Sequence, residues 1–315
     1  MWYKIGTIME YIKVREAAAR WGLSSRRVRA LCAAGRISGV VRKGNLYMIP
    51  SDSVKPADAR VSHTPDPQYA ALLERVDRLK EQFSQYRPLS DPEVDALRDE
   101  FIVEHTYNSN AIEGNTLTLR ETQLVLQGIT IDRKPLKDHL EVVGYRDAFE
   151  YVEQLAREQV PLTDYQIRAI HSLVLADRKE DRGRWRRVPV SIAGTLTKPV
   201  QPYEIEPMIG SLLADQGTVY QKLHPVEQVA WFHLRFESIH PFIDGNGRTG
   251  RLLMNLQLIK AGFPPINVKY ADRRRYYDAF EDYAQTGSPV AMVKLVAEYL
   301  AERLQTLIDI VSNVG

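Results

Sequence analysis

The chain has 315 residues, enough for two domains, and its 44% hydrophobic and 26% charged residues are typical of a soluble globular protein. A single cysteine, Cys32, excludes an internal disulfide framework and indicates a reducing compartment, so we expect a cytoplasmic protein. No run approaches the roughly 18 apolar residues of a membrane span, and the start of the chain lacks the apolar core of a signal peptide, so we expect no membrane partner.

Charge is divided unevenly along the chain. The formal net charge is only +2, but residues 1–60 contain 12 Lys or Arg and 4 Asp or Glu, which gives this segment +8 and leaves the remainder with −6. A basic segment joined to a mildly acidic body is typical of a nucleic-acid-binding head.

Residues 10–50 have the capping and helix-breaking residues expected of two short helices followed by a hairpin. A helical stretch from Arg15 to Trp21 is broken at Gly22, and a second helix capped by Ser24 ends at Gly35. Residues 40–49 then alternate as two strands that turn at 43–45. The segment resembles the excisionase/MerR-like winged helix-turn-helix modules of bacteria, which implies DNA as a partner; a protein-interaction module is the alternative. The candidate DNA contacts are Arg26 and Arg29 on the second helix and Arg42 and Lys43 on the wing.

A polar, proline-containing stretch over residues 51–67 separates this head from the rest of the chain. We therefore predict a domain at residues 1–60, a linker at 61–67 and a second domain at 68–315. The second domain opens with a helix whose apolar residues recur at spacings of three and four. We expect that stripe to pack on the body of the domain, although a homodimer formed through it stays open. The stripe consists of Tyr69, Leu72, Val76, Leu79, Phe83 and Tyr86.

A further helix begins at Asp91-Pro92 and runs toward a polar end. Ser109 and Glu113 are four residues apart, so they share one helical face, and Gly114 offers a stop directly after them. By itself this pattern is equally typical of a helix end with a surface glutamate. Residues 120–180 have helical periodicity, and His139 and His171 lie there without a second metal-type ligand at metal spacing, so we interpret them as ordinary histidines.

The residues from His240 to Arg251 read HPFIDGNGRTGR and lie between two apolar, helix-forming segments. Gly245 and Gly247 allow unusual backbone dihedrals and a close approach to a ligand. Backbone N–H groups at the start of the second helix, together with its dipole, form an anion site. The sequence therefore predicts a phosphate-binding loop, whereas the bland interpretation is a helix–loop–helix corner with solvated arginines.

The side chains of this loop suit the movement of a phosphate-containing group. Arg248 and Arg251 are three residues apart, and guanidinium groups match phosphate oxygens. Asp244 suits Mg²⁺, which usually takes one or two carboxylates together with phosphates and water. His240, directly before the anion site, can act as a general base toward a hydroxyl.

The loop matches the signature of the Fic family, H-x-F-x-[D/E]-G-N-G-R-x-x-R, at every specified position. The resemblance implies transfer of a nucleotidyl group, usually AMP from ATP, to a Tyr, Ser or Thr hydroxyl of a target protein. It also implies that His240 is the base and that Asp244 holds Mg²⁺. The implied phosphate contacts are Asn246 with the amides of Gly245 and Gly247 for the α-phosphate, and Arg248 and Arg251 for the β- and γ-phosphates.

Two further segments resemble parts of Fic proteins. The run from Ser109 to Gly114 is similar to the inhibitory helix that some members carry on the N-terminal side of the catalytic loop, here at about residues 92–114. The resemblance implies that Glu113 pairs with Arg251 and fills the γ-phosphate position. Residues 183–186 are similar to the segment that precedes a β-hairpin flap at about 188–202, although Leu196 and Thr197 stand where a histidine often follows the turn glycine.

These patterns predict a mainly α fold, with a Fic-type helical domain and a β-hairpin flap preceded by a small winged helix-turn-helix domain. The expected function is that of an autoinhibited protein adenylyltransferase that uses ATP and Mg²⁺. Two alternatives stay open. One is removal of AMP from a modified protein with the help of Glu113, and the other is a DNA-binding transcriptional regulator whose Fic domain senses nucleotide.

Overall fold

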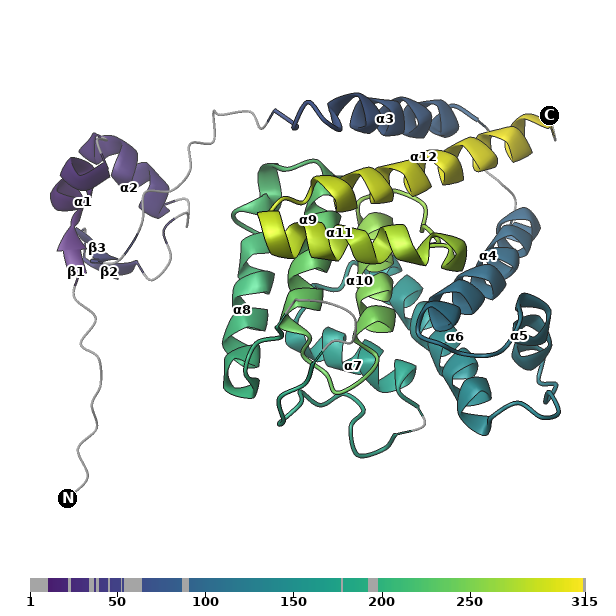
Figure 1. Ribbon diagram of the computed structural model, residues 1–315. Helices are drawn as coiled ribbons and strands as arrows, with labels where there is room; N and C mark the ends of the chain where they lie inside the picture. Colours follow the sequence, from purple (N-terminus) through teal and green to yellow (C-terminus); the bar gives the residue numbers. More distant parts are fainter. Residues whose placement is uncertain are drawn as a thin grey trace, which may run out of the picture. The chain divides into compact units, whose positions relative to one another are not determined.

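The structure is a computed structural model that describes residues 11–21, 24–33, 37, 40–44, 46–51, 53, 64–86, 91–176, 178–191 and 198–313. The chain is mainly helical, as predicted (Figure 1). It forms two compact units, residues 1–62 and 63–315. Each is described by itself.

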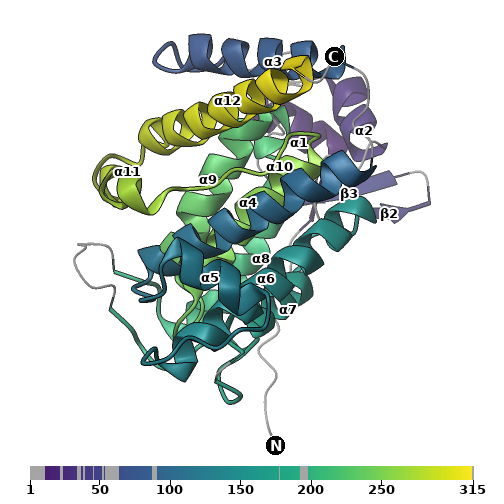
Figure 2. The same ribbon diagram turned by 90° about the vertical axis from the view of Figure 1, so that its right-hand side faces the viewer.

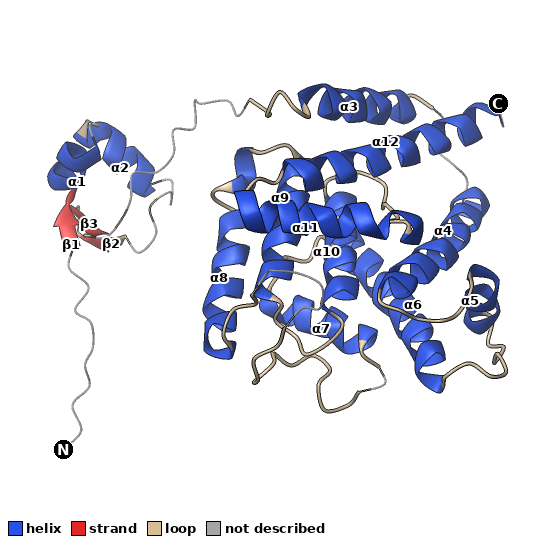
Figure 3. Cartoon of the chain, in the orientation of Figure 1, coloured by secondary structure: helices blue, strands red, loops and turns tan. Residues whose placement is uncertain are grey.

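The N-terminal unit combines two helices with a small sheet, drawn in red in Figure 3. Its elements are β1 (Tyr11–Lys13), α1 (Val14–Trp21), α2 (Ser25–Ala33), β2 (Val41–Lys43) and β3 (Leu46–Pro50). The sheet is antiparallel in the order β1-β3-β2, with Ile12 opposite Ile49 and Arg42 opposite Tyr47. Ala17, Val28 and Ile49 are completely buried between the helices and the sheet, so this unit has an apolar core of its own.

The basic side chains proposed for DNA contact are only partly described. Arg29 on α2 and Arg42 on β2 are exposed. The guanidinium of Arg42 donates to the carbonyl of Gly44 at 3.0 Å and lies over the ring of Tyr47. The side chains of Arg26 and Lys43, and the expected breaks at Gly22 and Gly35, lie outside the described residues.

The second unit is a helical body. Its helices are α3 (Ala70–Ser84), α4 (Asp91–Ile112), α5 (Leu119–Leu126), α6 (Leu136–Arg157), α7 (Asp164–Val174), α8 (Ile205–Gln216), α9 (Pro225–Ile239), α10 (Asn246–Lys260), α11 (Arg273–Thr286) and α12 (Val290–Asn313). Short 3₁₀ turns lie at Pro202–Glu204, Tyr220–Lys222 and Tyr270–Asp272. None of the described helices is long and apolar enough to cross a membrane.

Helix α10 occupies the centre of this body and contacts α9, α6, α7 and α4. Most of its residues are buried, including both arginines of the predicted phosphate-binding loop. A helix that is buried all round cannot show an amphipathic stripe, which is why its sequence reads as a continuous apolar run.

Helix α3 lies along α12, as the views in Figures 1 and 2 both show. Val76 and Leu79 of the apolar stripe are buried in the core that these two helices share with α9 and α11, and the partly buried Leu72 packs against it. The stripe therefore packs on the body of its own domain.

The predicted flap differs from expectation in the part that the structure describes. Residues 188–191 and 198–201 carry no strand, and the turn at Gly194 and Thr195 lies outside the described residues. The two arms are instead braced by one buried side chain. The guanidinium of Arg186 donates to the carbonyls of Val188 and Val200, and also to that of His240 at 2.8 Å.

Candidate active site

The loop between α9 and α10 has a backbone that only a few residues adopt easily. His240 ends α9 in the left-handed region at φ 49°, and Gly245 precedes α10 at φ 76°. A histidine in this region is uncommon, and such outliers gather at functional sites. These two left-handed residues turn the chain sharply at the two ends of the loop. The loop between two helices predicted from the sequence is therefore present, and it leads into the N-terminus of α10.

Asn246 closes this loop on itself. Its side-chain oxygen accepts from the N–H of Phe242 at 2.9 Å, and its side-chain nitrogen donates to the carbonyl of Phe242 at 2.9 Å. Asn246 is 2% exposed. The side chain therefore shapes the loop, and its second N–H leaves the expected phosphate contact a prediction, beside the backbone N–H groups at the start of α10.

Arg251 meets the end of α4. Its Nε donates to the hydroxyl of Ser109 at 2.8 Å, and its Nη2 donates to the Ser109 carbonyl and to Oε1 of Glu113, both at 2.8 Å. Glu113 lies in the turn directly after α4, where Gly114 takes φ 92°. The resemblance implied the contact with Glu113, and the structure adds Ser109 as a second partner; the two lie 138 and 142 residues from Arg251 along the chain.

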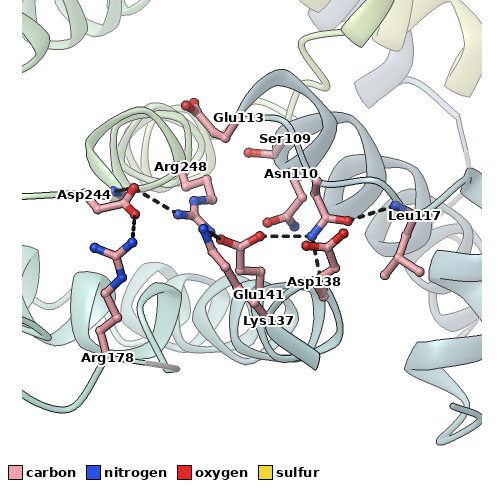
Figure 4. A network of polar contacts seen from close by, with 12 residues as sticks. Ser109, Asn110, Glu113, Leu117, Lys137, Asp138, Glu141, Arg178, Asp244 and Arg248 are labelled. Atoms are coloured by element: carbon pink, nitrogen blue, oxygen red, sulfur yellow. Dashed lines mark hydrogen bonds and ion pairs between the residues drawn. The ribbon is translucent and has the colours of Figure 1, made fainter. Parts of the chain in front are cut away.

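Arg248 lies between two carboxylates, as Figure 4 shows. Its Nη1 is 2.9 Å from Oε1 of Glu141 and its Nη2 is 3.3 Å from Oδ1 of Asp244. The guanidinium is 2% exposed, yet its Nε and Nη1 have no well-aligned hydrogen bond to any described residue. A buried guanidinium that keeps unused donors is suited to an oxyanion ligand.

Sequence reasoning missed the carboxylate and the arginine that complete this network. Glu141 on α6 is held by Lys137 at 3.5 Å and by the side-chain nitrogen of Asn115 at 3.0 Å. Arg178, after α7, lies 3.2 Å from Oδ2 of Asp244 (Figure 4). These residues are far from the loop in sequence, so spacing alone carried no signal for them.

His171 supports the loop from α7. Its ring stacks on Phe242 with centroids 3.6 Å apart. Its Nδ1 accepts from the N–H of Gly183 at 2.9 Å, so Nε2 carries the proton and donates to the carbonyl of Asp244 at 2.9 Å. Burial lowers its pKa to about 4, so the ring is neutral. The residue that we interpreted as an ordinary histidine is therefore a structural support of the site.

The titration behaviour of the loop suits a base next to an anion site. Burial, followed by the charge of Arg186, lowers the pKa of His240 to about 4, so its imidazole is neutral at physiological pH. Burial raises the pKa of Asp244, but Arg248, the N–H of Gly245 and Arg178 outweigh it, and the net pKa is lowered. His240 can accept a proton, and Asp244 is an ionised carboxylate.

The carboxylate of Asp244 fits a magnesium ion only together with ligands from outside the protein. No group of three potential protein ligands exists among the described residues, and Asp244 has two arginine neighbours. Mg²⁺ commonly takes one carboxylate and completes its shell with phosphate oxygens and water. The donor set therefore fits Mg²⁺ that arrives with a nucleotide.

Comparisons with known proteins agree with this geometry. Residues 161–258 match the Fic/DOC family. Protein adenylyltransferase Fic of Nematostella vectensis is 33% identical over 233 residues, which are 72% of this chain and 53% of that protein. The protein of the same name from Culex quinquefasciatus is 32% identical over 233 residues, 72% of this chain and 45% of its own length. The chain thus spans about half the length of the curated relatives it matches.

Solved structures show the same fold. A Fic domain containing signaling protein from Bacteroides thetaiotaomicron matches with a TM-score of 0.71 and 28% identity, over 76% of this chain and 97% of that one. Fic-1 from C. elegans matches with a TM-score of 0.70 and 27% identity, over 78% of this chain and 73% of that one. The mainly helical Fic fold expected from the sequence is confirmed, while the winged helix-turn-helix stays a prediction.

Proposed function

We propose that this chain is a protein adenylyltransferase of the Fic/DOC family, which transfers AMP from ATP to a hydroxyl group of a target protein and is held inactive by its own Glu113. The observation that carries the proposal is one arrangement at the start of α10. A neutral histidine, a loop with free backbone N–H groups and two buried arginines converge there. Relatives that share this region are named protein adenylyltransferases.

In this proposal His240 takes the proton of the target hydroxyl. The hydroxyl oxygen attacks the α-phosphorus, and pyrophosphate leaves. The backbone N–H groups at residues 246–248 and the dipole of α10 stabilise negative charge on the α-phosphate. Arg248 offers its unused Nε donor to the next phosphate. When it is bound at Asp244, Mg²⁺ supplies positive charge that neutralises the phosphate oxygens.

The inhibitory part of the proposal rests on Arg251. Its Nε and Nη2 donors are both taken up by Ser109 and Glu113. A Cβ atom built on Gly247 would lie 2.3 Å from Oε1 of Glu113, so the glutamate sits directly against the phosphate loop. A carboxylate in that position excludes a phosphate group, because both require the same donors and carry the same charge.

One experiment tests transfer and its restraint together. Full-length chain and its Glu113→Gly variant are incubated with Mg²⁺ and with ATP labelled at either the α- or the γ-phosphate, in the presence of cell lysate. We expect Glu113→Gly to incorporate the α-label and not the γ-label into protein, either in a target or in the chain itself. Retention of the γ-label would indicate phosphoryl transfer instead. Failure of both proteins to incorporate the α-label would contradict the proposed function.

We further propose that the N-terminal unit binds duplex DNA. The support is the charge of +8 on residues 1–60, together with the order of a strand, two helices and a two-stranded hairpin. The exposed Arg29 and Arg42 lie on α2 and β2, which would be the recognition helix and the wing of such a module. Binding that weakens steeply with salt would support this proposal, because phosphate contacts release counterions.

A further inference from the structure

Glu237, in the last turn of α9, is a carboxyl side chain in the interior of the site. It is 12% exposed, and its Oε1 is buried without a hydrogen-bond partner among the described residues. Helix α10 makes room for it, because a Cβ atom at Gly250 would lie 2.3 Å from this oxygen. A buried polar atom without a partner is costly. A carboxyl group together with a glycine that accommodates it therefore indicates a role beyond packing.

Glu237 faces His240. Its Oε2 is 3.9 Å from Nδ1 of His240, and this nitrogen is also buried and unpartnered among the residues that the structure describes. The separation exceeds a hydrogen bond. Catalytic hydrogen bonds are often long before substrate binds and tighten in the reacting complex. The carboxyl group that carries the unpartnered Oε1 thus brings its other oxygen, Oε2, within 3.9 Å of the unpartnered Nδ1, a gap that a small side-chain rotation can close to a hydrogen bond.

The other charged and titratable groups around Glu237 come from four elements. The charges of Glu113, after α4, and of Arg251, on α10, shift the pKa of its carboxyl group. Tyr276 and Tyr277 of α11 are influenced by its charge, and His233 of α9 lies beside the same glycine. The charge of Arg186 lowers the pKa of His240. Of these groups, Glu113 is the one whose removal makes ionisation of Glu237 easier.

We propose that Glu237 is a positioning residue for His240: its carboxylate accepts the Nδ1–H of the imidazole, which leaves Nε2 unprotonated toward the target hydroxyl. The inference rests on the proposed function, which gives His240 the role of base. As the hydroxyl oxygen bonds to the α-phosphorus and the bond to pyrophosphate breaks, the hydroxyl proton moves to Nε2. The resulting imidazolium is stabilised by the carboxylate opposite Nδ1, in the manner known for paired acid and histidine residues.

The protonation of Glu237 makes this arrangement testable. Burial, and next the charge of Glu113, raise the pKa of Glu237 to about 8, against the opposing effect of Arg251. The side chain is therefore a neutral acid at lower pH and becomes the accepting carboxylate as pH rises. Replacement of Glu113 by glycine removes a repelling charge, so the transition should move to lower pH.

The first measurement needs neither nucleotide nor metal. Full-length Glu113→Gly protein with ¹⁵N-labelled histidine is titrated by NMR from about pH 5 to about pH 9, a range that brackets the pKa of Glu237. A His240→Ala variant assigns the ring signals. We expect the His240 nitrogens to report a rising fraction of the Nδ1–H tautomer as Glu237 ionises. Glu237→Gln in the same background should abolish this change. A parent protein without any such change overturns the proposal.

Two further variants distinguish a positioning role of Glu237 from a general disturbance of the site. Glu227→Gln removes another buried carboxylate of α9, one that accepts from Tyr69 and not from His240, so it should leave the tautomer titration as in the parent. Gly250→Ala keeps Glu237 but forces its carboxyl group away, so it should reproduce the effect of Glu237→Gln. If Glu237→Gln keeps the parent's titration, another acceptor orients the ring, and the proposal is wrong.

Transfer rates provide the second readout. Across the pH range of the tautomer change, transfer by the Glu113→Gly parent should accelerate, while the rate of Glu113→Gly/Glu237→Gln should stay flat. At the alkaline end the double variant should be about tenfold slower, less than the roughly 10²–10⁴-fold contribution of a general base, because His240 itself is retained. Equal rate profiles for the two proteins would contradict the inference. If the parent shows the tautomer change but transfers no AMP, the proposed function fails and the contact between Glu237 and His240 stands.

Discussion

Replacement of Glu113 by glycine should tighten the binding of ATP but not that of AMP. Glu113 makes one charge-assisted hydrogen bond to the buried Nη2 of Arg251 at 2.8 Å. Such a bond contributes about 1.5–3 kcal/mol. The glutamate side chain is 33% exposed, so we expect the lower part of that range. Since 1.4 kcal/mol corresponds to a factor of ten, ATP affinity should rise about tenfold.

The assay is a calorimetric titration of wild type and Glu113→Gly with ATP and with AMP, in buffer that contains EDTA so that transfer is prevented. AMP has no γ-phosphate, so it does not compete with Glu113 for Arg251, and its affinity should change less than about threefold, within 0.7 kcal/mol. Ser109→Ala is the matched control, because it removes one hydrogen bond to the same guanidinium without removing a charge. An equal gain for AMP and ATP, or no gain for either, would refute the idea that Glu113 occupies the γ-phosphate position.

Further predictions concern His240 as the base, duplex binding by the N-terminal unit, and the stability of the protein at low pH. His240→Ala in a Glu113→Gly background should lower AMP transfer by roughly 10²–10⁴-fold while nucleotide affinity is retained; normal transfer would remove His240 from the mechanism. Arg29→Ala in the full chain should weaken duplex binding by about 1–3 kcal/mol if Arg29 reads a base, as measured by titration at two salt concentrations. Binding that is indifferent to salt would exclude the DNA interpretation. Burial lowers the pKa values of His105 and His233 to about 3, so the folded protein should lose stability as pH falls below about 6.5, where the unfolded chain binds the extra protons. Chemical unfolding at pH 7 and pH 5 checks the sign, and greater stability at pH 5 would contradict it.

Residues that are close in sequence were predictable, and those that meet only through folding were not. The motif from His240 to Arg251 has local backbone requirements, so its helix–loop–helix geometry followed from glycine positions and apolar periodicity. The distant partner Glu113 was identified only because a family resemblance supplied the pairing. Glu141 and Arg178 have no sequence pattern of their own, since α6 and α7 bring them to the loop by packing.

The flap shows the opposite error, in which a resemblance assigned more than the described residues display. Strands were expected over residues 188–202, but the described arms are held by Arg186 instead of by strand pairing. Asn246 has in addition a role that the resemblance did not supply, because both ends of its amide bond the backbone of Phe242 and close the turn. In both places backbone groups outside regular secondary structure needed hydrogen-bond partners, and a nearby polar side chain supplies them.

The brace at Arg186 has a mechanical consequence. One planar group ties Val188 and Val200 to the carbonyl of His240, so a force applied to the segment that contains these valines is transmitted to the backbone of the base itself. A lysine has one nitrogen and cannot reach carbonyls that lie in several directions, so Arg186→Lys would cut this linkage while it keeps the charge. The segment and the loop would then move independently, and a protein that presses on the segment would no longer shift the histidine.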